Sequence, residues 1–482
     1  MNLKPYPEYK DSGVEWLGKI PEHWELRRLK YCSEVIMGQS PPGENYNIDG
    51  NGLPFLQGCA EFGQNYPKPK QYCPLANKTC PSGSILLSVR APVGRINVAD
   101  QIYGIGRGLC AIVPYSEVFS SNFAVYGLQM YRIGLAFEST GSTYDAVTIG
   151  KVENLLVYLP RVSEQYQITR FLDVKTRLID RYIRNKRRLI KLLQEQKQAI
   201  INDCVTGKME VKNIVDENGN TSFRLQPYTE YKDSGVEWLG KIPAHWRAIR
   251  LKFICKEPLK YGANEVSGYL DANQPRFVRI TDIDENGNLR NDTICTITKE
   301  KAEEFLLTEG DILFARSGAT VGKTFIYKKD WGEAAFAGYL IRARINPNIV
   351  IAQYIYMFTR SGIYLSWKNS IFIQATIQNI SAEKYSSLFI PIPLLAEQEC
   401  IIKWISDKNH EIDNAISKAQ RQIDLIREYR IRLIADVVTG KVDVRDIPVE
   451  DIPEDGTLEE LEDEQEELEE LPDIEENGDG DD

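Results

Sequence analysis

The hydrophobic pattern changes abruptly after Pro160, where a long stretch without glycine or proline begins. From Ser163 to Val205 the apolar residues recur at gaps of 3, 4 and 7, at Ile168, Leu172, Ile179, Ile183, Ile190, Leu193 and Ile200. This spacing predicts one long helix with a single apolar seam. About 40 residues at ~1.5 Å each would give a helix of roughly 60 Å. Ser163 is a suitable N-terminal cap, and Gly207 a suitable end.

A second stretch of the same kind follows Pro393 and stops at Gly440. Its apolar seam consists of Ile401, Ile405, Ile412, Ile416, Ala419, Ile423, Ile426, Leu433 and Val437. A single helix of this kind would leave an apolar stripe in water. The two seams therefore predict an intramolecular antiparallel coiled coil.

The regions before the two helices have a different pattern of apolar residues. Short apolar runs alternate with glycine and proline between residues 31 and 160, as in GLPFLQG (Gly52–Gly58), SILLSV (Ser84–Val89) and LLVYLP (Leu155–Pro160). This pattern is typical of strands joined by loops, with one or two helices. A similar stretch covers residues 247–393. The sequence predicts a mixed α/β fold with two such domains in tandem, each followed by a long helix.

The two halves are copies of one another. The segment Tyr9–Trp24 returns as Tyr231–Trp246, 222 residues later, with 15 of 16 positions identical; we call these the lead segments. Glu-Gln at 164–165 returns at 397–398, and Val-Thr-Gly-Lys at 205–208 returns at 438–441, both 233 residues later. Each copy has nearly the length of a whole domain rather than of a solenoid repeat. A tandem duplication with a pseudo-two-fold relation is expected.

These patterns set the expected domain boundaries. The first α/β domain covers 1–160 and the first helix 161–208. A linker covers 209–224, the second α/β domain 225–393, and the second helix 394–441. An acidic, disordered tail is expected over 442–482, with a role as a charge mimic or partner-binding segment as the alternative.

The charges are segregated along the chain. Asp446 to Asp482 holds 20 acidic and no basic residues, so the remaining residues carry 58 basic against 49 acidic side chains, a net charge of +9. A mildly basic body permits contacts with phosphates. The nine cysteines form no CxxC pair, which fits reduced thiols. There is no N-terminal signal region and no run of ~18 apolar residues. We therefore expect a cytoplasmic protein.

No pattern of catalytic residues or metal ligands stands out. The histidines are His23, His245 and His410; the first two lie beside tryptophans, where packing is the simpler role. There is no HExxH motif or Cys/His cluster, so neither a metal site nor a catalytic residue is predicted. Gly318–Thr324, GATVGKT, has three residues between its first glycine and the GK pair, whereas a phosphate-binding loop has four. The longer segment Gly310–Lys323 instead shares with Gly83–Arg95 a scheme of G-x-I-L followed by a loop that ends V-G-[K/R].

Basic and polar residues in the glycine- and proline-rich loops are the candidate DNA contacts. In the first domain they are Gln39, Ser40, Arg90, Arg95 and Arg107; in the second they are Lys260, Arg279, Arg316 and Lys323. Arginine pairs with guanine, asparagine and glutamine pair with adenine, and lysine or serine contacts phosphates. For any single residue, a solvated loop position is the simpler interpretation. The duplication favours two related readers of two half-sites that differ in sequence.

These motifs together resemble the specificity subunit of a type I restriction–modification system. The resemblance covers roughly residues 1–445. It rests on the lead segments, GQSPP (Gly38–Pro42), SVRAPVGRIN (Ser88–Asn97) with IGRG (Ile105–Gly108), and the EQ and VTGK blocks that flank each long helix. The acidic tail lies outside the family pattern.

The resemblance implies that each α/β domain reads one half of a bipartite, asymmetric site in double-stranded DNA. The helices would set the gap and dock two modification (methyltransferase) subunits, and restriction (endonuclease) subunits would join them. The chain itself would bind no cofactor and carry no catalytic residue. S-adenosylmethionine, ATP and Mg²⁺ would bind to the partners, which methylate an adenine flipped out of the duplex.

Two alternatives come from other classes of protein. A coiled-coil adaptor whose globular ends bind proteins would share the helices, but it does not account for diverged, loop-rich domains on a basic body. A nuclease or methyltransferase that acts alone would need the catalytic motifs that the sequence lacks. Salt-sensitive binding to duplex DNA would distinguish the first alternative from a DNA reader.

Overall fold

The computed structural model describes residues 4–13, 18–63, 66–129, 147–215, 221–265, 270–284, 287–318, 320–373 and 379–449. The chain forms two compact units. Unit 1 consists of residues 1–184 and 423–482, and unit 2 consists of residues 185–422. Each unit holds one α/β domain together with part of both long helices, and each is described by itself.

The main sheet of unit 1 is antiparallel, with the strand order β4-β11-β8-β9. Its strands are β4 (Ser33–Met37), β11 (Leu109–Pro114), β8 (Ile85–Ser88) and β9 (Ile96–Val98). A second sheet has the order β6-β5-β10-β7, in which β5 and β10 are parallel. These strands are β6 (Gln71–Cys73), β5 (Leu53–Leu56), β10 (Tyr103–Ile105) and β7 (Thr79–Cys80). Two antiparallel pairs join β1 (Tyr9–Asp11) to β2 (Lys19–Pro21) and β3 (Glu25–Arg28) to β12 (Leu156–Leu159). The short helices are α1 (Ser121–Gln129) and α3 (Ile149–Glu153).

The main sheet of unit 2 has the order β18-β23-β20-β21. Its strands are β18 (Lys260–Tyr261), β23 (Leu340–Ala343), β20 (Ile312–Ala315) and β21 (Thr324–Ile326). β19 (Arg276–Val278) and β22 (Ala334–Phe336) form a parallel pair. Antiparallel pairs join β15 (Tyr231–Asp233) to β16 (Lys241–Pro243) and β17 (Arg247–Arg250) to β24 (Phe389–Ile392). The helices are α5 (Lys299–Ala302), α6 (Ala352–Phe358), α7 (Gly362–Ile373) and α8 (Ala382–Ser386).

The duplication in the sequence is also a duplication of topology. The order β4-β11-β8-β9 in unit 1 corresponds strand for strand to β18-β23-β20-β21 in unit 2. The register agrees as well, because Ser88 pairs with Leu109 where Ala315 pairs with Leu340. The parallel pair β5–β10 corresponds to β19–β22. The predicted mixed α/β fold with an internal repeat is confirmed.

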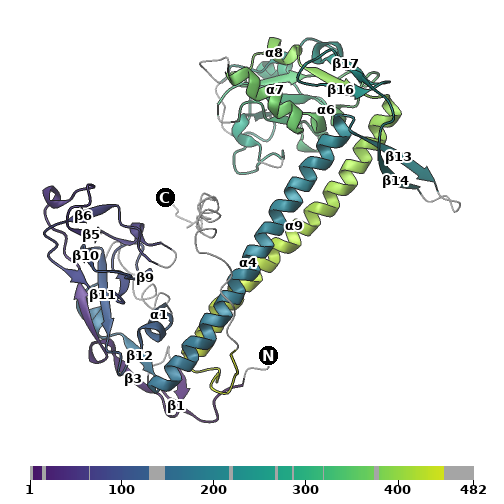
Figure 1. Cartoon of the computed structure of the whole chain (residues 1–482). Helices are drawn as coiled ribbons and strands as arrows, with labels where there is room; N and C mark the ends of the chain where they lie inside the picture. Colours follow the sequence, from purple (N-terminus) through teal and green to yellow (C-terminus); the bar gives the residue numbers. More distant parts are fainter. Residues whose placement is uncertain are drawn as a thin grey trace. The chain divides into compact units, whose positions relative to one another are not determined.

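The two long helices are α4 (Val162–Val205) and α9 (Leu395–Val438), each of 44 residues. They run side by side and antiparallel (Figure 1). Every residue of the two predicted seams is buried or half-buried, so the seams do face the partner helix. Ion pairs flank them: Asp180 with Arg430 at 2.7 Å in unit 1, and Lys197 with Asp413 at 2.7 Å in unit 2. The predicted coiled coil is confirmed.

The segment expected to be a linker, 209–224, is instead largely an antiparallel hairpin. Its strands are β13 (Met209–Val215) and β14 (Thr221–Pro227). The residues between the strands, DENGN, lie outside the described residues, but their composition is that of a hairpin turn. Phe223 of the hairpin packs edge-on against Trp404 of α9. Phe223 is half-buried and packs against the core of unit 2, which explains why the segment folds onto this unit rather than serving as a loose connection.

The start of the expected tail is also ordered. Val444 is 2% exposed, and Lys4 forms a β-bridge with Asp443. The Arg445 guanidinium lies over the ring of Tyr6. The disordered tail expected from residue 442 therefore cannot begin before residue 446, and the residues from 450 onward lie outside the described residues. Among the described helices, none is long and apolar enough to cross a membrane.

Candidate nucleic-acid interface

The repeated blocks of the sequence meet at one site in each unit. In unit 1 the Glu164 carboxylate at the start of α4 is 4% exposed. Its Oε1 accepts hydrogen bonds from the Tyr6 hydroxyl at 2.8 Å and from Trp24 Nε1 at 3.0 Å, and its Oε2 lies 2.8 Å from His23 Nε2. Burial, reinforced by Glu164, raises the pKa of Tyr6 far above its ordinary value, so this hydroxyl remains a donor. The lead segment is thereby bound to the helix.

Unit 2 repeats this arrangement. Glu397 at the start of α9 accepts from Trp246 Nε1 at 3.0 Å, lies 3.0 Å from His245 Nε2, and accepts from the Tyr228 hydroxyl. Tyr6 and Tyr228 are also 222 residues apart, so the repeat extends further towards the N-terminus than the lead segments suggested. We call these two sites the latches.

The VTGK blocks complete the latches. Gly440 has a φ of 75°, and a Cβ there would lie 2.4 Å from Pro21 Cδ. Its carbonyl oxygen accepts from the Tyr9 hydroxyl at 3.0 Å. Gly207 makes the same close approach to Pro243 in unit 2. Only glycine fits this backbone and this space, which explains why the block that ends each helix is repeated.

The glutamines of the EQ blocks bind the α/β domains. Gln165 Nε2 donates to the carbonyl oxygens of Pro160 and Val118, both at 2.9 Å, and its Oε1 accepts from Ser120 N at 2.8 Å. Gln398 makes the corresponding bonds to Pro393, Ile349 and Ile351. Glutamate and glutamine together therefore fix each domain on a helix terminus.

One end of the main sheet in unit 1 gathers all five candidate residues of the first domain. The end of β4 leads to Gln39 and Ser40, the end of β8 leads to Arg90, Arg95 precedes β9, and Arg107 lies in the turn between β10 and β11. Gln39 and the three arginines are exposed, and Ser40 is half-buried. We call this end the first edge. Residues far apart in the sequence thus form one polar, basic surface.

Backbone contacts hold the loops of the first edge close together. Gln39 N donates to Ile105 O at 2.9 Å, Arg107 N donates to Ser40 Oγ at 3.1 Å, and Val89 N donates to Gly108 O at 3.0 Å. A Cβ on Gly38 would lie 2.1 Å from Gly106 O. The glycines of GQSPP and IGRG therefore permit two loops to touch, and the exposed side chains project from a rigid base.

The second edge is the equivalent end of the sheet in unit 2, and it holds two of the four candidates predicted there. Arg316 follows β20, and its guanidinium lies over the ring of Tyr261 at 4.9 Å. Lys323 precedes β21 and is exposed. It corresponds to Arg95, because Ala315 N donates to Lys323 O at 2.9 Å as Ser88 N does to Arg95 O. The shared V-G-[K/R] scheme is therefore a shared hairpin.

The side chains of Lys260 and Arg279 are bound within their own domain. The Lys260 ammonium donates to the carbonyl oxygen of Glu304 at 2.9 Å and lies over the ring of Phe305. Arg279 holds Asp282 through Nε and Nη2 and donates to Thr293 O. Both ionic groups are thus held by partners within the domain. The backbone of Arg279 nevertheless lies beside the second edge, because Val278 O accepts from Ala337 N at 3.0 Å.

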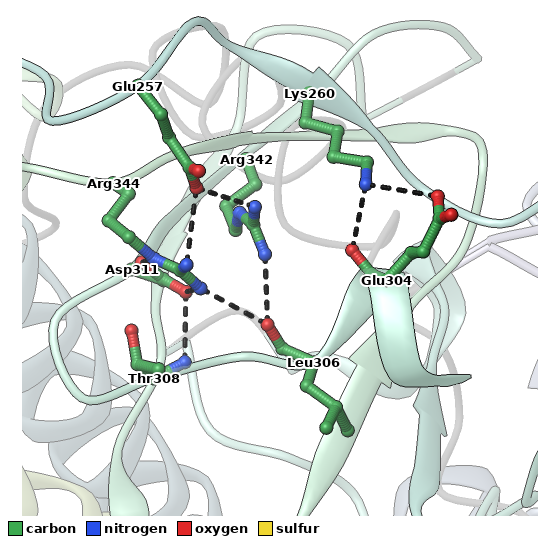
Figure 2. A network of polar contacts seen from close by, with 8 residues as sticks. All are labelled: Glu257, Lys260, Glu304, Leu306, Thr308, Asp311, Arg342 and Arg344. Carbon is green, nitrogen blue, oxygen red and sulfur yellow. Dashed lines mark hydrogen bonds and ion pairs between the residues drawn. The ribbon is translucent and has the colours of Figure 1, made fainter. Parts of the chain in front are cut away.

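Lys260 borders a network of charged residues in unit 2 (Figure 2). Arg342 and Arg344 both contact Glu257, and Arg344 also binds Asp311 at 2.9 Å. The hydrogen bonds that Arg344 donates to Asp311 raise the pKa of Arg344, whereas burial lowers the pKa of Arg342. Arg342 lies in β23 and Arg344 directly follows the strand, two positions later, so both side chains point to the same side. Each also donates to Leu306 O, which ties the preceding loop to the sheet.

Sequence reasoning missed three residues of the second edge: Tyr261, Asn264 and Tyr339. Tyr339 is 68% exposed and Tyr261 39% exposed. Asn264 is exposed and lies against Gly338. The signal that locates Asn264 is the register, because Gly262 N donates to Leu340 O at 3.2 Å as Gly38 N does to Leu109 O at 2.9 Å. Gly262-Ala263-Asn264 therefore corresponds to Gly38-Gln39-Ser40, which sequence identity alone does not reveal.

Neither a nucleotide loop nor a metal cluster is found in the described part of the chain. Gly318–Thr324 joins β20 to β21, whereas a phosphate-binding loop of the nucleotide type joins a strand to a helix. Within the ranges described, no group of three or more His, Cys, Asp or Glu side chains could hold a metal ion.

Two equivalent α/β domains, each with an exposed polar edge and each bound to the start of a long helix, define a protein with an internal duplication. The family model for the type I restriction modification DNA specificity domain matches residues 21–192 and 260–423. These ranges cover more than half of the chain, one in each half. The chain belongs to this family.

Curated relatives support the assignment. The type I restriction enzyme MjaX specificity subunit of Methanocaldococcus jannaschii is 38% identical over 208 residues, which is 42% of this chain and 48% of that protein. The match therefore spans about half of that relative. The MjaIX specificity subunit of the same organism is 21% identical over 91% of this chain and 98% of its own length. The EcoKI specificity subunit of Escherichia coli is 23% identical over 42% of this chain and 44% of its own length.

Solved structures share the fold. A chain from a structure of complex assembly and conformational transition of the type I R-M system has a TM-score of 0.66 at 17% identity, covering 88% of this chain and 99% of that chain. The HsdS subunit from Thermoanaerobacter tengcongensis has a TM-score of 0.50 at 15% identity, covering 88% of this chain and 98% of that chain.

Proposed function

We propose that this specificity subunit reads a bipartite, asymmetric site in double-stranded DNA, with one half-site for each edge. The observation that carries the proposal is the pair of equivalent edges. They share topology and register but differ in their polar side chains. The first edge presents Gln39, Arg90, Arg95 and Arg107, and the second presents Arg316 and Lys323. Equal frameworks with different side chains are what two half-sites of different sequence require.

The paired helices are the proposed docking surface for two modification subunits. In unit 1 the exposed apolar side chains of the helices are Tyr166, Leu178, Tyr182, Leu425, Tyr429 and Ile431. In unit 2 they include Leu189 and Leu192. Apolar residues that remain exposed after the seam is filled favour a further protein partner. Restriction subunits would join through the modification subunits.

In this proposal the partner subunits catalyse the methylation and the cleavage of DNA. Specificity subunits are the non-catalytic part of type I restriction–modification systems. The methyltransferase partners would bind S-adenosylmethionine and flip the target adenine, and the endonuclease partners would use ATP and Mg²⁺. The contribution of this chain is to position both on one duplex.

A map of methylated adenines across the genome, with this gene intact and deleted, tests the proposal. We expect the deletion to remove methylation at one motif of two short half-sites separated by a fixed gap. If the map is unchanged, the purified complex decides the matter. Binding that shows no sequence preference and no loss with rising salt would refute a DNA-reading role.

A further inference from the structure

The two edges carry equivalent turns of equal length. In unit 1 the turn runs from Ile105 to Leu109, and Gln39 N donates to Ile105 O at 2.9 Å. In unit 2 it runs from Phe336 to Leu340, and Ala263 N donates to Phe336 O at 2.9 Å. Equivalent hydrogen bonds close the two turns: Leu109 N donates to Gly106 O at 3.0 Å, and Leu340 N donates to Ala337 O at 2.9 Å. The central residue of the first turn, Arg107, therefore corresponds to Gly338 in the second.

In the first turn the central side chain is a guanidinium. Arg107 is exposed, its neighbours on both sides are buried glycines, and its backbone N is fixed by Ser40 Oγ. A Cβ on Gly108 would lie 2.5 Å from Gln57 O, so the turn is packed against the neighbouring strand. Arg107 is thus a planar donor on a rigid turn, an arrangement suited to bidentate recognition.

In the second turn a different residue fills the same place. Gly338 has no side chain, and a Cβ built there would lie 2.0 Å from Asn264 Oδ1. The carboxamide of Asn264 therefore occupies the position where the side chain of residue 338 would begin. The turn of unit 1 thus presents the guanidinium of Arg107. At the turn of unit 2 the carboxamide of Asn264 takes the equivalent place, beside the exposed Tyr339.

We propose that Arg107 and Asn264 are specificity-determining residues, with Arg107 contacting a guanine in one half-site and Asn264 an adenine in the other. The inference rests on the proposed function. A guanidinium fork matches O6 and N7 of guanine, and a carboxamide matches N6 and N7 of adenine in the major groove. The equivalent position in the two half-sites therefore differs in base pair.

The hairpin cations next to the turns serve as matched controls. Arg95 and Lys323 occupy equivalent positions and are both exposed, yet one edge uses a guanidinium and the other an ammonium. Interchangeable cations at one structural position are typical of contact with a phosphate, where only charge is needed. Arg95 and Lys323 are thus expected to contribute affinity without sequence preference.

The experiment uses the full chain assembled with its modification subunits and a library of duplexes randomised in both half-sites. Arg107→Gln and Arg107→Lys are compared with Arg95→Gln, and Asn264→Ala is compared with Lys323→Gln. Base preference at each position and the salt dependence of affinity are measured for each complex. Arg107→Lys keeps the charge but removes the planar fork, so it separates base reading from attraction to phosphate.

Both Arg107 variants should lower the preference for guanine at one position of one half-site, by about 5- to 150-fold. Asn264→Ala should do the same for adenine in the other half-site. Arg95→Gln and Lys323→Gln should leave the preferences intact, weaken binding to every sequence, and reduce the slope of log K against log salt by about 0.9.

The inference is overturned if Arg107→Lys and Asn264→Ala retain every base preference of the unaltered complex. It is also overturned if the Arg95 variant changes a base preference in the same way as the Arg107 variants. A complex with the unaltered chain that selects no sequence would contradict the proposed function itself, which is a distinguishable result.

Discussion

The latch of unit 1 gives a prediction whose size follows from its contacts. Glu164→Ala removes the carboxylate that accepts from Tyr6 and Trp24 and that contacts His23. Tyr6 is 3% exposed and Trp24 fully buried, so their donors would find no water in the unrelaxed site. His23 is partly exposed and can be hydrated.

The expected cost is several kcal/mol. Each hydrogen bond to a charged acceptor contributes about 1.5–3 kcal/mol, and each buried donor left unpaired costs about 1–3 kcal/mol. These contributions share one carboxylate and do not add. We therefore expect a loss of about 3–5 kcal/mol, comparable to removing one partner of a buried ion pair. For a unit of this size, each kcal/mol corresponds to about 2–4 °C in the melting temperature.

Thermal unfolding combined with amide hydrogen exchange measures this loss. Glu164→Gln is the matched control, because it retains an acceptor oxygen for Tyr6 and Trp24 and should cost less than half as much. Glu397→Ala makes the same change in unit 2. Each alanine variant should unprotect the lead segment of its own unit only, read out at the amides of Trp24 and Trp246, which donate to Pro21 and Pro243. An unchanged melting temperature and unchanged protection in Glu164→Ala would refute the latch as a source of stability.

Three further predictions follow from individual contacts. Gly440→Ala should destabilise unit 1 by about 1–3 kcal/mol in denaturant unfolding, more than the control Gly13→Ala. Both glycines have a positive φ, but only a Cβ at Gly440 would clash with a neighbour, Pro21. Equal losses in the two variants would mean that the close approach to Pro21 is unimportant. Asp311→Ala should cost unit 2 about 1–3 kcal/mol, because it removes a buried acceptor of Arg344 while Glu257 still pairs with that guanidinium; an unchanged free energy of unfolding would contradict this. Burial raises the pKa of Cys80 from 9.0 to about 11 and that of Cys204 to about 12. Above pH ~9 the unfolded thiols lose protons that the folded thiols retain, so the free energy of unfolding should fall as pH rises from about 9 towards 11; alanine variants should flatten this decline in a pH series of unfolding curves.

The long helices and the duplication were accessible from sequence because both depend on local, repeating patterns. The apolar residues from Ile168 to Ile200 recur with the period of an α-helix, so this pattern is visible in the sequence alone. The EQ and VTGK blocks were visible as repeats, but their purpose was not. Glu164 meets Trp24 across 140 positions, and no spacing rule connects them.

The candidate edge residues show where sequence reasoning ends. The structure brings Arg107 and Arg95 together at one end of a sheet, and the sequence pointed to both because functional side chains often lie in loops on a rigid framework. The sequence could not show that the side chains of Lys260 and Arg279 are engaged within their own domain, since their carboxylate and carbonyl partners come from loops 14 to 44 residues away or from a neighbouring turn. Asn264 was missed because only the register of β18 relates it to Ser40. The strands at Met209–Val215 and Thr221–Pro227 were missed because the glycine and asparagine between them in the sequence are equally common in loose connections.

The two latches are alike in space but differ in when they can form. In unit 2 the Tyr231 hydroxyl reaches the carbonyl of Lys208, only 23 positions away, whereas in unit 1 the Tyr9 hydroxyl reaches Gly440 across 431 positions. The additional loop closure in unit 1 costs roughly 2–3 kcal/mol of chain entropy. Unit 2 is continuous in sequence, so it can finish folding while the ribosome is still synthesising the rest of the chain. The α/β domain of unit 1, although made first, must wait for the last turns of α9 before its latch can close.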